Sequence, residues 1–156
     1  MTQQIWAFLG GKQVPEEDAT VGVKTHALHY GTAVFEGIRG NWNERLGKVA
    51  IFRLEEHYER LLRGCKILRI NLPYSVADLC KITIDLLEKN GFAEDVYIRP
   101  LAFKGEQLVA NLNLNTVADE FMLVIQPFGD YIDNSRPLKG QTSSWRRPMD
   151  SSMPTG

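Results

Sequence analysis

Cysteine is scarce in this sequence, and its placement excludes two common uses of the residue. Only two of the 156 residues are cysteines, Cys65 and Cys80. Neither stands in a CxxC or Cys/His spacing, so the sequence does not predict a zinc site. Both fall at positions that we expect on apolar helix faces. Reduced core thiols are therefore the favoured interpretation, and a disulfide is the less favoured one.

A strong charge of either sign is also lacking. The formal net charge is −1 at pH 7, and no block of like charges occurs, so neither nucleic acid nor a membrane is an expected partner. The sequence has no run of about 18 apolar residues that would span a bilayer. The N-terminus lacks the basic region and long apolar run of a signal peptide. We therefore expect a cytoplasmic protein.

Several catalytic motifs are missing as well. The sequence contains no GxSxG segment, no P-loop and no glycine-rich dinucleotide fingerprint, so the corresponding enzyme classes are not predicted. The histidines are His26, His29 and His57. His26 and His29 would share a face of a helical turn, but no carboxylate stands at metal-ligand spacing. Packed structural histidines are favoured over a metal pair, and His57 is expected to be a partly exposed surface residue.

The sequence does contain enough apolar material for a core. With 156 residues and 44% apolar composition, we expect one domain, or one domain with a short additional segment. Apolar residues around Gly10-Gly11 predict a small hairpin. Residues 48–52 predict a strand that pairs with residues 37–42, whereas residues 25–40 favour a compact functional turn over a regular element.

Two amphipathic helices are predicted in the middle of the chain. From Leu54 onward, apolar residues recur at spacings of three and four, which is typical of a helix with one buried face. The second helix begins at Ser75, which forms an approximate capping box with Asp78, and it ends at Asn90-Gly91.

Two further strands are predicted after the helices. Residues 96–103 form one, and because Pro100 lies inside it we expect an edge strand or a bulge. Residues 120–128 are a stronger candidate, since 121–125 is a continuous apolar run. The elements together predict an α+β fold, with a mixed or antiparallel sheet and two helices packed on one side.

The arginines are the most informative polar residues. Tyr97 and Arg99 stand two apart in a predicted strand and therefore share a face. A phenol beside a guanidinium on a rigid strand is a plausible carboxylate-binding pair, because the guanidinium fork binds both oxygens. Arg60 has the ordinary alternative of an ion pair with Glu56 one helical turn earlier, and Arg39 that of a solvent-exposed residue.

Aromatic residues stand beside glycines or at predicted strand ends. Packing in the core is the ordinary interpretation of each, and a pocket wall for an apolar side chain is the alternative. The aromatic residues concerned are Tyr30, Phe35, Tyr97, Phe128 and Tyr131.

The segment HALHYGTAVFEGIR, residues 26–39, closely resembles the N-terminal signature of the branched-chain aminotransferases, which are class IV (fold type IV) pyridoxal-phosphate enzymes. Later segments resemble the same family in the same order. They are residues 52–68, 96–103, 127–133 and 143–156. The resemblance extends over nearly the whole chain, but over only about the first half of such an enzyme, including its small N-terminal domain.

The resemblance implies roles for individual residues. In the family, the arginine matched by Arg60 contacts the phosphate of pyridoxal 5'-phosphate, and the residues matched by Tyr97 and Arg99 receive substrate carboxylates. The other implied substrate-binding residues are Tyr30, Phe35, Gly37, Arg39, Phe128 and Tyr131. Two departures bear on substrate preference: many relatives have tryptophan where Phe128 stands, and residues 104–116 replace a glycine-rich loop.

The resemblance also implies a missing part. The family's Schiff-base lysine follows the S-x-x-P-T-G stretch, whereas this sequence ends at Gly156. No catalytic residue is therefore assigned within the chain, and Lys104 and Lys139 are poor substitutes. The implied divisions are a small domain at 1–128, a linker at 129–140 and the start of a large cofactor domain at 141–156.

The implied activity is exchange of the amino group between leucine, isoleucine or valine and 2-oxoglutarate, by a homodimer or larger homo-oligomer. The 156-residue chain alone is expected to be inactive. Two alternatives are another class IV enzyme, such as a D-amino-acid transaminase or an aminodeoxychorismate lyase, and a non-catalytic assembly or binding domain. The wording VFEGIR argues against the first, since those relatives tend to carry a G-D-G-type sequence there.

Overall fold

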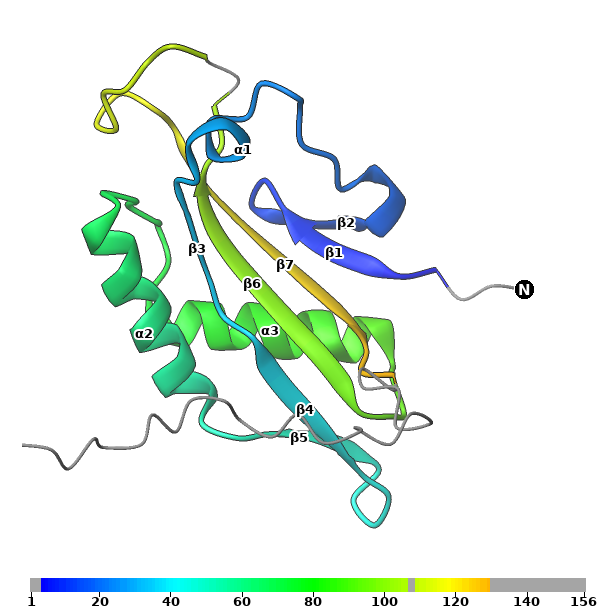
Figure 1. The fold of residues 1–156 in the computed structure, drawn as a ribbon. Coiled ribbons are helices and arrows are strands. Elements are labelled where there is room, and N and C mark those ends of the chain that lie inside the picture. Colours follow the sequence, from blue (N-terminus) through cyan, green and yellow to red (C-terminus); the bar gives the residue numbers. More distant parts are fainter. Residues whose placement is uncertain (1–3, 107–108, 130–156) are drawn as a thin grey trace, which may run out of the picture.

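A single antiparallel sheet organises the chain (Figure 1). The computed structural model describes residues 4–106 and 109–129. Within them, the sheet has seven strands. Six follow the order β2-β1-β7-β6-β4-β5, the seventh, β3, pairs with β6, and every pairing is antiparallel. The strands are β1 (Trp6–Leu9), β2 (Lys12–Pro15), β3 (Ala33–Phe35), β4 (Ile38–Asn43), β5 (Lys48–Ile51), β6 (Val96–Lys104) and β7 (Asp119–Pro127).

Two long helices, α2 (Leu54–Ile67) and α3 (Val76–Asn90), pack on one side of this sheet (Figure 1). The described residues also form a 3-10 turn, η1 (Glu16–Asp18), and a short helix, α1 (His26–Tyr30). The predicted hairpin is formed by β1 and β2, and β5 pairs with β4 as predicted. The predicted α+β fold is confirmed. No described helix is long and apolar enough to cross a membrane.

Residues 25–40, predicted to be a compact turn, contain regular structure instead. They carry α1, β3 and the beginning of β4. Helix α1 has five residues and β3 has three, which is too short for either element to produce a recognisable period. Strand β3 exists because it pairs with β6, and such a tertiary contact overrides the local pattern.

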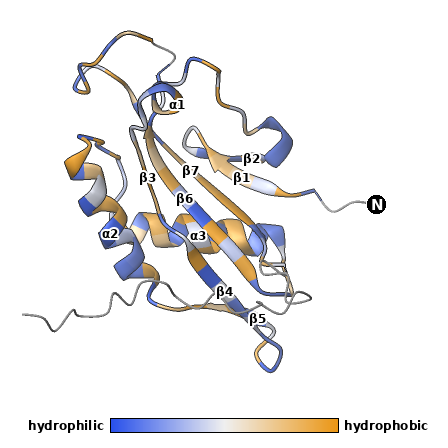
Figure 2. Cartoon of the chain, viewed as in Figure 1, coloured by the Kyte–Doolittle hydropathy of each residue, from blue (hydrophilic) through white to orange (hydrophobic). Residues whose placement is uncertain are grey.

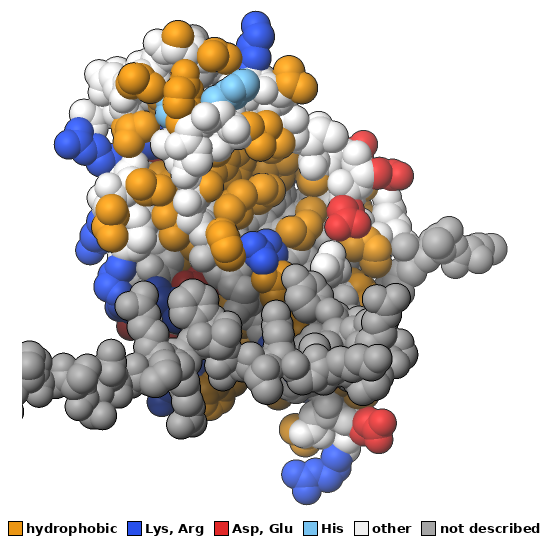
Figure 3. Space-filling view, in the orientation of Figure 1, with side chains coloured by type: hydrophobic (Ala, Val, Ile, Leu, Met, Phe, Trp, Pro, Cys, Tyr) orange, Lys and Arg blue, Asp and Glu red, His pale blue; other side chains and the backbone are white. Residues whose placement is uncertain are grey.

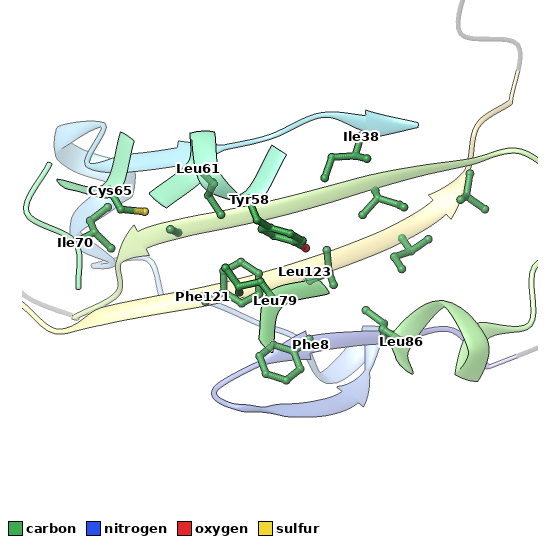
Figure 4. Packing of buried hydrophobic residues seen from close by; sticks show 14 residues of the cluster. Phe8, Ile38, Tyr58, Leu61, Cys65, Ile70, Leu79, Leu86, Phe121 and Leu123 are labelled. Carbon is green, nitrogen blue, oxygen red and sulfur yellow. The ribbon is translucent and has the colours of Figure 1, made fainter. Parts of the chain in front are cut away.

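The hydrophobic core lies between the two long helices and the sheet (Figure 4). Tyr58 and Leu61 of α2, Leu79 of α3, and Ile98 and Leu123 of the central strands are all completely buried. Full burial of such an aliphatic side chain contributes roughly 1.5–3 kcal/mol. The apolar stripes predicted for both helices are confirmed, and hydrophilic residues alternate with them along each helix (Figure 2).

Both cysteines are free thiols, as the sequence predicts. Cys65 is buried in the core, and this burial raises its pKa to about 11. Burial also raises the pKa of Cys80. Because the thiolate is the reactive form, burial favours the protonated, less reactive form of both thiols.

Alternation along the strands gives the sheet one covered face and one open face. On β6, Val96, Ile98 and Ala102 point toward the helices and are buried, whereas Tyr97 and Arg99 point the opposite way. Neither long helix covers this opposite face, and apolar side chains gather on it (Figure 3). Tyr97 and Arg99 therefore share the open face of the sheet.

Pro100 lies in a central strand whose register is continuous on both sides, so the prediction of an edge strand or a bulge was wrong. Strand β6 pairs with β7 on one side and with β3 and β4 on the other. The common register of β3 and β4 places Glu36 opposite Pro100 and Gly37 opposite Arg99. The Glu36 amide donates to the Pro100 carbonyl at 3.1 Å, but proline has no N–H to return a second bond. The missing donor interrupts the neighbouring strand, which divides into β3 and β4.

Helix α3 begins and ends as predicted. The amide of Asp78 donates to Ser75 Oγ at 3.2 Å, and the amide of Ser75 donates to Asp78 Oδ2 at 2.9 Å, which completes the capping box. The hydrogen bonds from Ser75 lower the pKa of Asp78. Gly91 follows the helix with φ of 63°, a left-handed conformation that glycine adopts without strain.

A buried lysine ties three segments of the chain together. Lys104, at the end of β6, is 1% exposed. Its ammonium donates to the carbonyl oxygens of Arg69 and Leu114, both at 2.7 Å, and to that of Val117 at 3.3 Å. Asp119 Oδ1 lies 2.5 Å from Nζ and supplies the opposite charge. Three protons thus meet three acceptors beside a carboxylate, which is what a buried ammonium requires.

Replacement of Lys104 by methionine is expected to lower the free energy of unfolding by roughly 3–5 kcal/mol. The change leaves the Asp119 carboxylate, 15% exposed, without its opposite charge, and three carbonyl groups without their donor. Equilibrium unfolding in urea measures the effect as a lower midpoint at an unchanged slope.

Lys81→Met is the matched control for this experiment. Lys81 pairs with Asp85 on the surface of α3, with Nζ and Oδ2 2.6 Å apart and the lysine side chain 73% exposed. Removal of such a pair costs about 0.5 kcal/mol or less. Equal losses of stability in the two variants would contradict the role assigned to Lys104.

Candidate active site

Residues 35–37 lie at the strand interruption, and their side chains serve both faces of the sheet. Phe35 and Gly37 are on the open face, where they adjoin Arg99 and Tyr97. Glu36 points the other way, toward α2. This alternation is the ordinary period of an extended chain. The tripeptide consequently connects groups that lie on opposite faces.

Arg99 is held in one orientation by two aromatic residues. Its guanidinium carbon lies 4.2 Å from the ring centroid of Phe35 and 5.1 Å from that of Tyr97, both within cation–π range. Its Nη2 donates a hydrogen bond to the Tyr97 hydroxyl. Its Nε is buried and has no hydrogen-bond acceptor among the described residues. The predicted tyrosine–arginine pair is formed, and the described residues leave the Nε proton of Arg99 without an acceptor.

Gly37 leaves the space that the Tyr97 hydroxyl occupies. A Cβ atom at position 37 would lie 2.7 Å from the hydroxyl oxygen, closer than real side-chain contacts allow. A larger residue would push the phenol away and weaken its hydrogen bond to Arg99. Glycine at this position is therefore a packing requirement of the tyrosine–arginine pair.

Arg39 and Phe128 extend this group along the same face. Arg39 is the register partner of Tyr97, and its guanidinium carbon lies 4.7 Å from the ring centroid of Phe128. The rings of Phe128 and Tyr97 are 5.9 Å apart. Arg39 Nη2 donates to Asp95 Oδ2 at 2.7 Å, and this bond, followed by one from the Trp42 amide, lowers the pKa of Asp95. Arg39 therefore already has a carboxylate partner.

Tyr30 lies apart from this group. It is the last residue of α1, near the end of β6 that pairs with β3, whereas Arg39 and Tyr97 lie toward the other end (Figure 1). The Tyr30 hydroxyl accepts a hydrogen bond from the Ala110 amide at 2.9 Å, and its ring lies 4.4 Å from that of His26. Its polar contact is thus with the loop that follows β6.

The histidines of α1 have structural surroundings. His26 is completely buried, and its ring nitrogens lie 2.9 Å from Thr32 Oγ1 and 2.8 Å from the Asn111 carbonyl oxygen. His29 Nε2 lies 2.9 Å from the Val23 carbonyl oxygen. Within residues 4–106 and 109–129, no group of three or more metal-ligating side chains is found. His26 is thus the packed, hydrogen-bonded histidine that the sequence predicts.

Arg60 projects from α2 and pairs with Glu36 rather than with Glu56. Its Nε donates to Glu36 Oε1 at 2.6 Å, and its Nη2 donates to Oε2. His57 Nδ1 lies 3.0 Å from the same Oε2. Glu36 is 5% exposed, and the hydrogen bond from Arg60 is the main cause of its lowered pKa. The carboxylate therefore stays ionised at neutral pH despite its burial.

Glu36 and His57 are the residues that sequence reasoning missed. His57, predicted to be a partly exposed surface residue, is 24% exposed and is bound to Glu36. A signal existed at Glu36, because a carboxylate inside the segment AVFEGI needs a charged partner if it is buried. No local pattern could identify that partner, which lies on a helix 24 residues away.

The structure thus brings most, but not all, of the predicted site residues together. Those that form one connected group on the open face are Phe35, Gly37, Arg39, Tyr97, Arg99 and Phe128. Arg60 adjoins the group from the other face, through Glu36. Tyr30 lies apart, and Tyr131 lies outside the described residues. A cavity of about 840 Å³ lies elsewhere, between β5, α2 and α3, and none of these residues lines it.

Comparison with known proteins points to one family. Residues 33–155 match the family model described as amino-transferase class IV. The probable branched-chain-amino-acid aminotransferase of Aquifex aeolicus is 44% identical over 151 residues, which cover 96% of this chain and 48% of that protein. The branched-chain-amino-acid aminotransferase of Escherichia coli K12 is 36% identical over 156 residues, with coverages of 96% and 48%. This chain spans about half the length of these curated relatives.

Solved structures agree with these sequence matches. The branched-chain aminotransferase of the archaeon Thermoproteus uzoniensis, determined with norvaline, matches with a TM-score of 0.76 and 38% identity over 83% of this chain and 43% of that chain. The enzyme of Thermobaculum terrenum, determined in its PLP-form (holo-form), matches with a TM-score of 0.67 and 35% identity, over 81% and 41%. Because the family model covers most of the sequence, the chain belongs to the class IV aminotransferases.

Proposed function

We propose that this chain is the N-terminal part of a pyridoxal-phosphate-dependent aminotransferase that exchanges the amino group between leucine, isoleucine or valine and 2-oxoglutarate. The names of the relatives support this reaction class. The main structural support for the proposal is the environment of the Arg99 guanidinium. Its guanidinium is fixed between Phe35 and Tyr97, and its buried Nε has no acceptor among the described residues.

Arg99 is suited to bind the carboxylate of an amino acid. A buried donor without an acceptor costs about 1–3 kcal/mol, and a ligand carboxylate that accepts this bond removes the cost. The Tyr97 hydroxyl, already bonded to the same guanidinium, offers a second polar contact. The ring of Phe35, 55% exposed, and that of Phe128 offer apolar surface to an aliphatic side chain.

A dicarboxylic substrate needs a second positive group. Arg39 is on the same face, and its side chain is 54% exposed despite the bond to Asp95. We assign it to the second carboxylate of glutamate or 2-oxoglutarate. Tyr30 and Tyr131 are retained as further substrate-site residues because of the family resemblance.

Arg60 is the group proposed to bind the phosphate of pyridoxal 5'-phosphate. Glu36 accepts one N–H from its Nε and one from its Nη2, and the other three N–H groups form no hydrogen bond with the described residues. The side chain is 63% exposed, so this edge can bind an anion. When bound, pyridoxal phosphate supplies a ring that withdraws electrons and carries the amino group between substrates. The PLP-form of the Thermobaculum terrenum relative supports this cofactor.

The Schiff-base lysine is proposed to lie beyond Gly156. Lys104 is unsuitable, because its ammonium is buried and bound to three carbonyl groups, and Lys139 lies outside the described residues. The 156-residue chain alone is therefore proposed to be inactive, and the intact protein to form a homodimer or larger homo-oligomer. Its proposed divisions are a small domain at 1–128, a linker at 129–140 and a large cofactor domain from 141.

The complete protein encoded by the reading frame that contains this chain is expected to transfer the amino group of L-leucine to 2-oxoglutarate. Activity with D-alanine is expected to be far lower. Glutamate formation with L-leucine, and amino transfer from D-alanine measured under the same conditions, test this. A preference for D-alanine would instead indicate a D-amino-acid transaminase, and no transfer from leucine, isoleucine or valine would refute the proposed substrate class.

Arg99→Lys in the complete protein is expected to reduce kcat/KM for L-leucine by roughly 10- to 100-fold. Lysine keeps the charge but loses the planar fork and the Nε donor, a loss equivalent to roughly one hydrogen bond to a charged group. Steady-state kinetics with varied L-leucine measures the change.

Arg63→Lys provides the control for Arg99→Lys. Arg63 is an exposed residue of α2 whose only ion pair among the described residues is the surface contact with Glu59 at 3.7 Å. Its kinetic constants are expected to equal those of the wild type. If Arg99→Lys behaves like Arg63→Lys, Arg99 does not bind the substrate carboxylate.

A further inference from the structure

Glu36 has an arrangement that an ordinary surface ion pair does not require. It occupies the strand interruption opposite Pro100 and is almost completely buried. Its two oxygens accept hydrogen bonds from Arg60 Nε, Arg60 Nη2 and His57 Nδ1. Burial of a carboxylate costs several kcal/mol unless it is paired and hydrogen-bonded, and here each oxygen has a partner. The carboxylate is therefore fixed in position as well as neutralised.

Two contacts to one carboxylate also fix the plane of the Arg60 guanidinium. The Nε and Nη2 atoms define one edge of that planar group, and this edge faces Glu36. Of the N–H groups that remain, one on Nη1 and one on Nη2 lie along the outer end of the guanidinium, and the second Nη1 proton points back beside Cδ. That outer end has the spacing that binds two oxygens of a phosphate or carboxylate. An anion can therefore bind Arg60 without displacing Glu36.

We propose that Glu36 is the positioning residue for Arg60, which it holds so that the outer edge of the guanidinium forms a preset fork for the phosphate of the cofactor. This inference rests on the proposed function. His57 assists by binding the Glu36 oxygen that also accepts the Arg60 Nη2 proton. The lowered pKa of Glu36 keeps the carboxylate charged under the conditions in which a phosphate would bind. Preorganisation of this kind avoids the entropy cost of ordering a long side chain.

The charge of Glu36 provides a way to test this idea. A carboxylate close to a phosphate repels it, so a Glu36 that was merely near the cofactor would weaken binding. Its removal would then strengthen phosphate binding. A Glu36 that positions Arg60 has the opposite effect, because Arg60 without it samples other rotamers. The direction of the change therefore separates the two roles.

The experiment compares pyridoxal 5'-phosphate with pyridoxal, which lacks the phosphate, as ligands of the complete apoprotein. Glu36→Gln is expected to weaken binding of pyridoxal phosphate about tenfold, the loss of roughly one hydrogen bond to a charged group. Binding of pyridoxal is expected to stay unchanged. Glu56→Gln, which alters an exposed glutamate of α2 paired with Arg53 at 3.6 Å, is the matched control and should change neither affinity.

Two further variants keep the test decisive. Glu36→Asp retains the buried charge for Arg60 and His57, which protects folding, but it withdraws the carboxylate by one methylene; it should also weaken pyridoxal phosphate selectively. Arg60→Lys removes the fork, and adding Glu36→Gln to it should cause no further loss, because Glu36 acts through Arg60.

Unchanged or tighter binding of pyridoxal phosphate to the Glu36 variants would overturn the inference. Equal losses for pyridoxal phosphate and pyridoxal would also overturn it, because they indicate a purely structural role. Failure of the wild-type apoprotein to bind pyridoxal phosphate at all would refute the proposed function itself. The wild-type titration therefore distinguishes the two failures.

Discussion

The absence of an N–H group on Pro100 is the constraint on which the arrangement of this site depends. The antiparallel ladder would otherwise continue from β3 into β4, because both strands share one register against β6. Opposite the proline, only one of the two expected backbone bonds forms. The ladder stays intact on the β7 side, where β6 pairs along its whole length. Pro100 thus interrupts the strand formed by β3 and β4, whereas the pairing of β6 with β7 stays complete.

Residues 35–37 lie between two arginines, Arg99 on the open face of the sheet and Arg60 on the face toward the helices. Phe35 and Gly37 shape the surroundings of Arg99 on the open face, and Glu36 orients Arg60 at the helix face. Among the described residues β3 pairs with β6 alone, so its other edge is free. The proposed function requires one ligand to reach both arginines around that edge. The proposed enzyme would use Arg99 for the substrate carboxylate and Arg60 for the cofactor phosphate.

Much of the fold follows from local sequence. The helical periods after Leu54 and Ser75, the capping box and the glycine that ends α3 are all short-range signals, and each was predicted correctly. The elements between residues 25 and 40 were not, because three- and five-residue elements carry too little pattern. Pro100 was misplaced for a related reason. The sequence shows that Pro100 cannot donate a backbone hydrogen bond. Only the strand register shows which neighbouring strand lacks that bond.

The site was predictable to the extent that its residues share a strand. Tyr97 and Arg99 follow from the period of two, and the structure adds the Phe35 ring and the close approach at Gly37. The contact between Glu36 and His57 was not predicted, because it joins a residue at the strand interruption to a residue of α2. The same holds for Lys104, whose four oxygen neighbours come from two other segments, Arg69 after α2 and residues 114–119 at the start of β7. Ion pairs between residues that lie far apart in the sequence cannot be predicted from local patterns.

The most direct test of this arrangement is a crystal structure of the complete protein with N-(5'-phosphopyridoxyl)-L-leucine, a single molecule that carries both the phosphate and the substrate carboxylate. The proposed site predicts that Arg60 binds the phosphate through the guanidinium edge away from Glu36, while Arg99 Nε binds the leucine carboxylate. A complex in which either arginine makes no contact with the ligand, or in which Glu36 is displaced from Arg60, would contradict it.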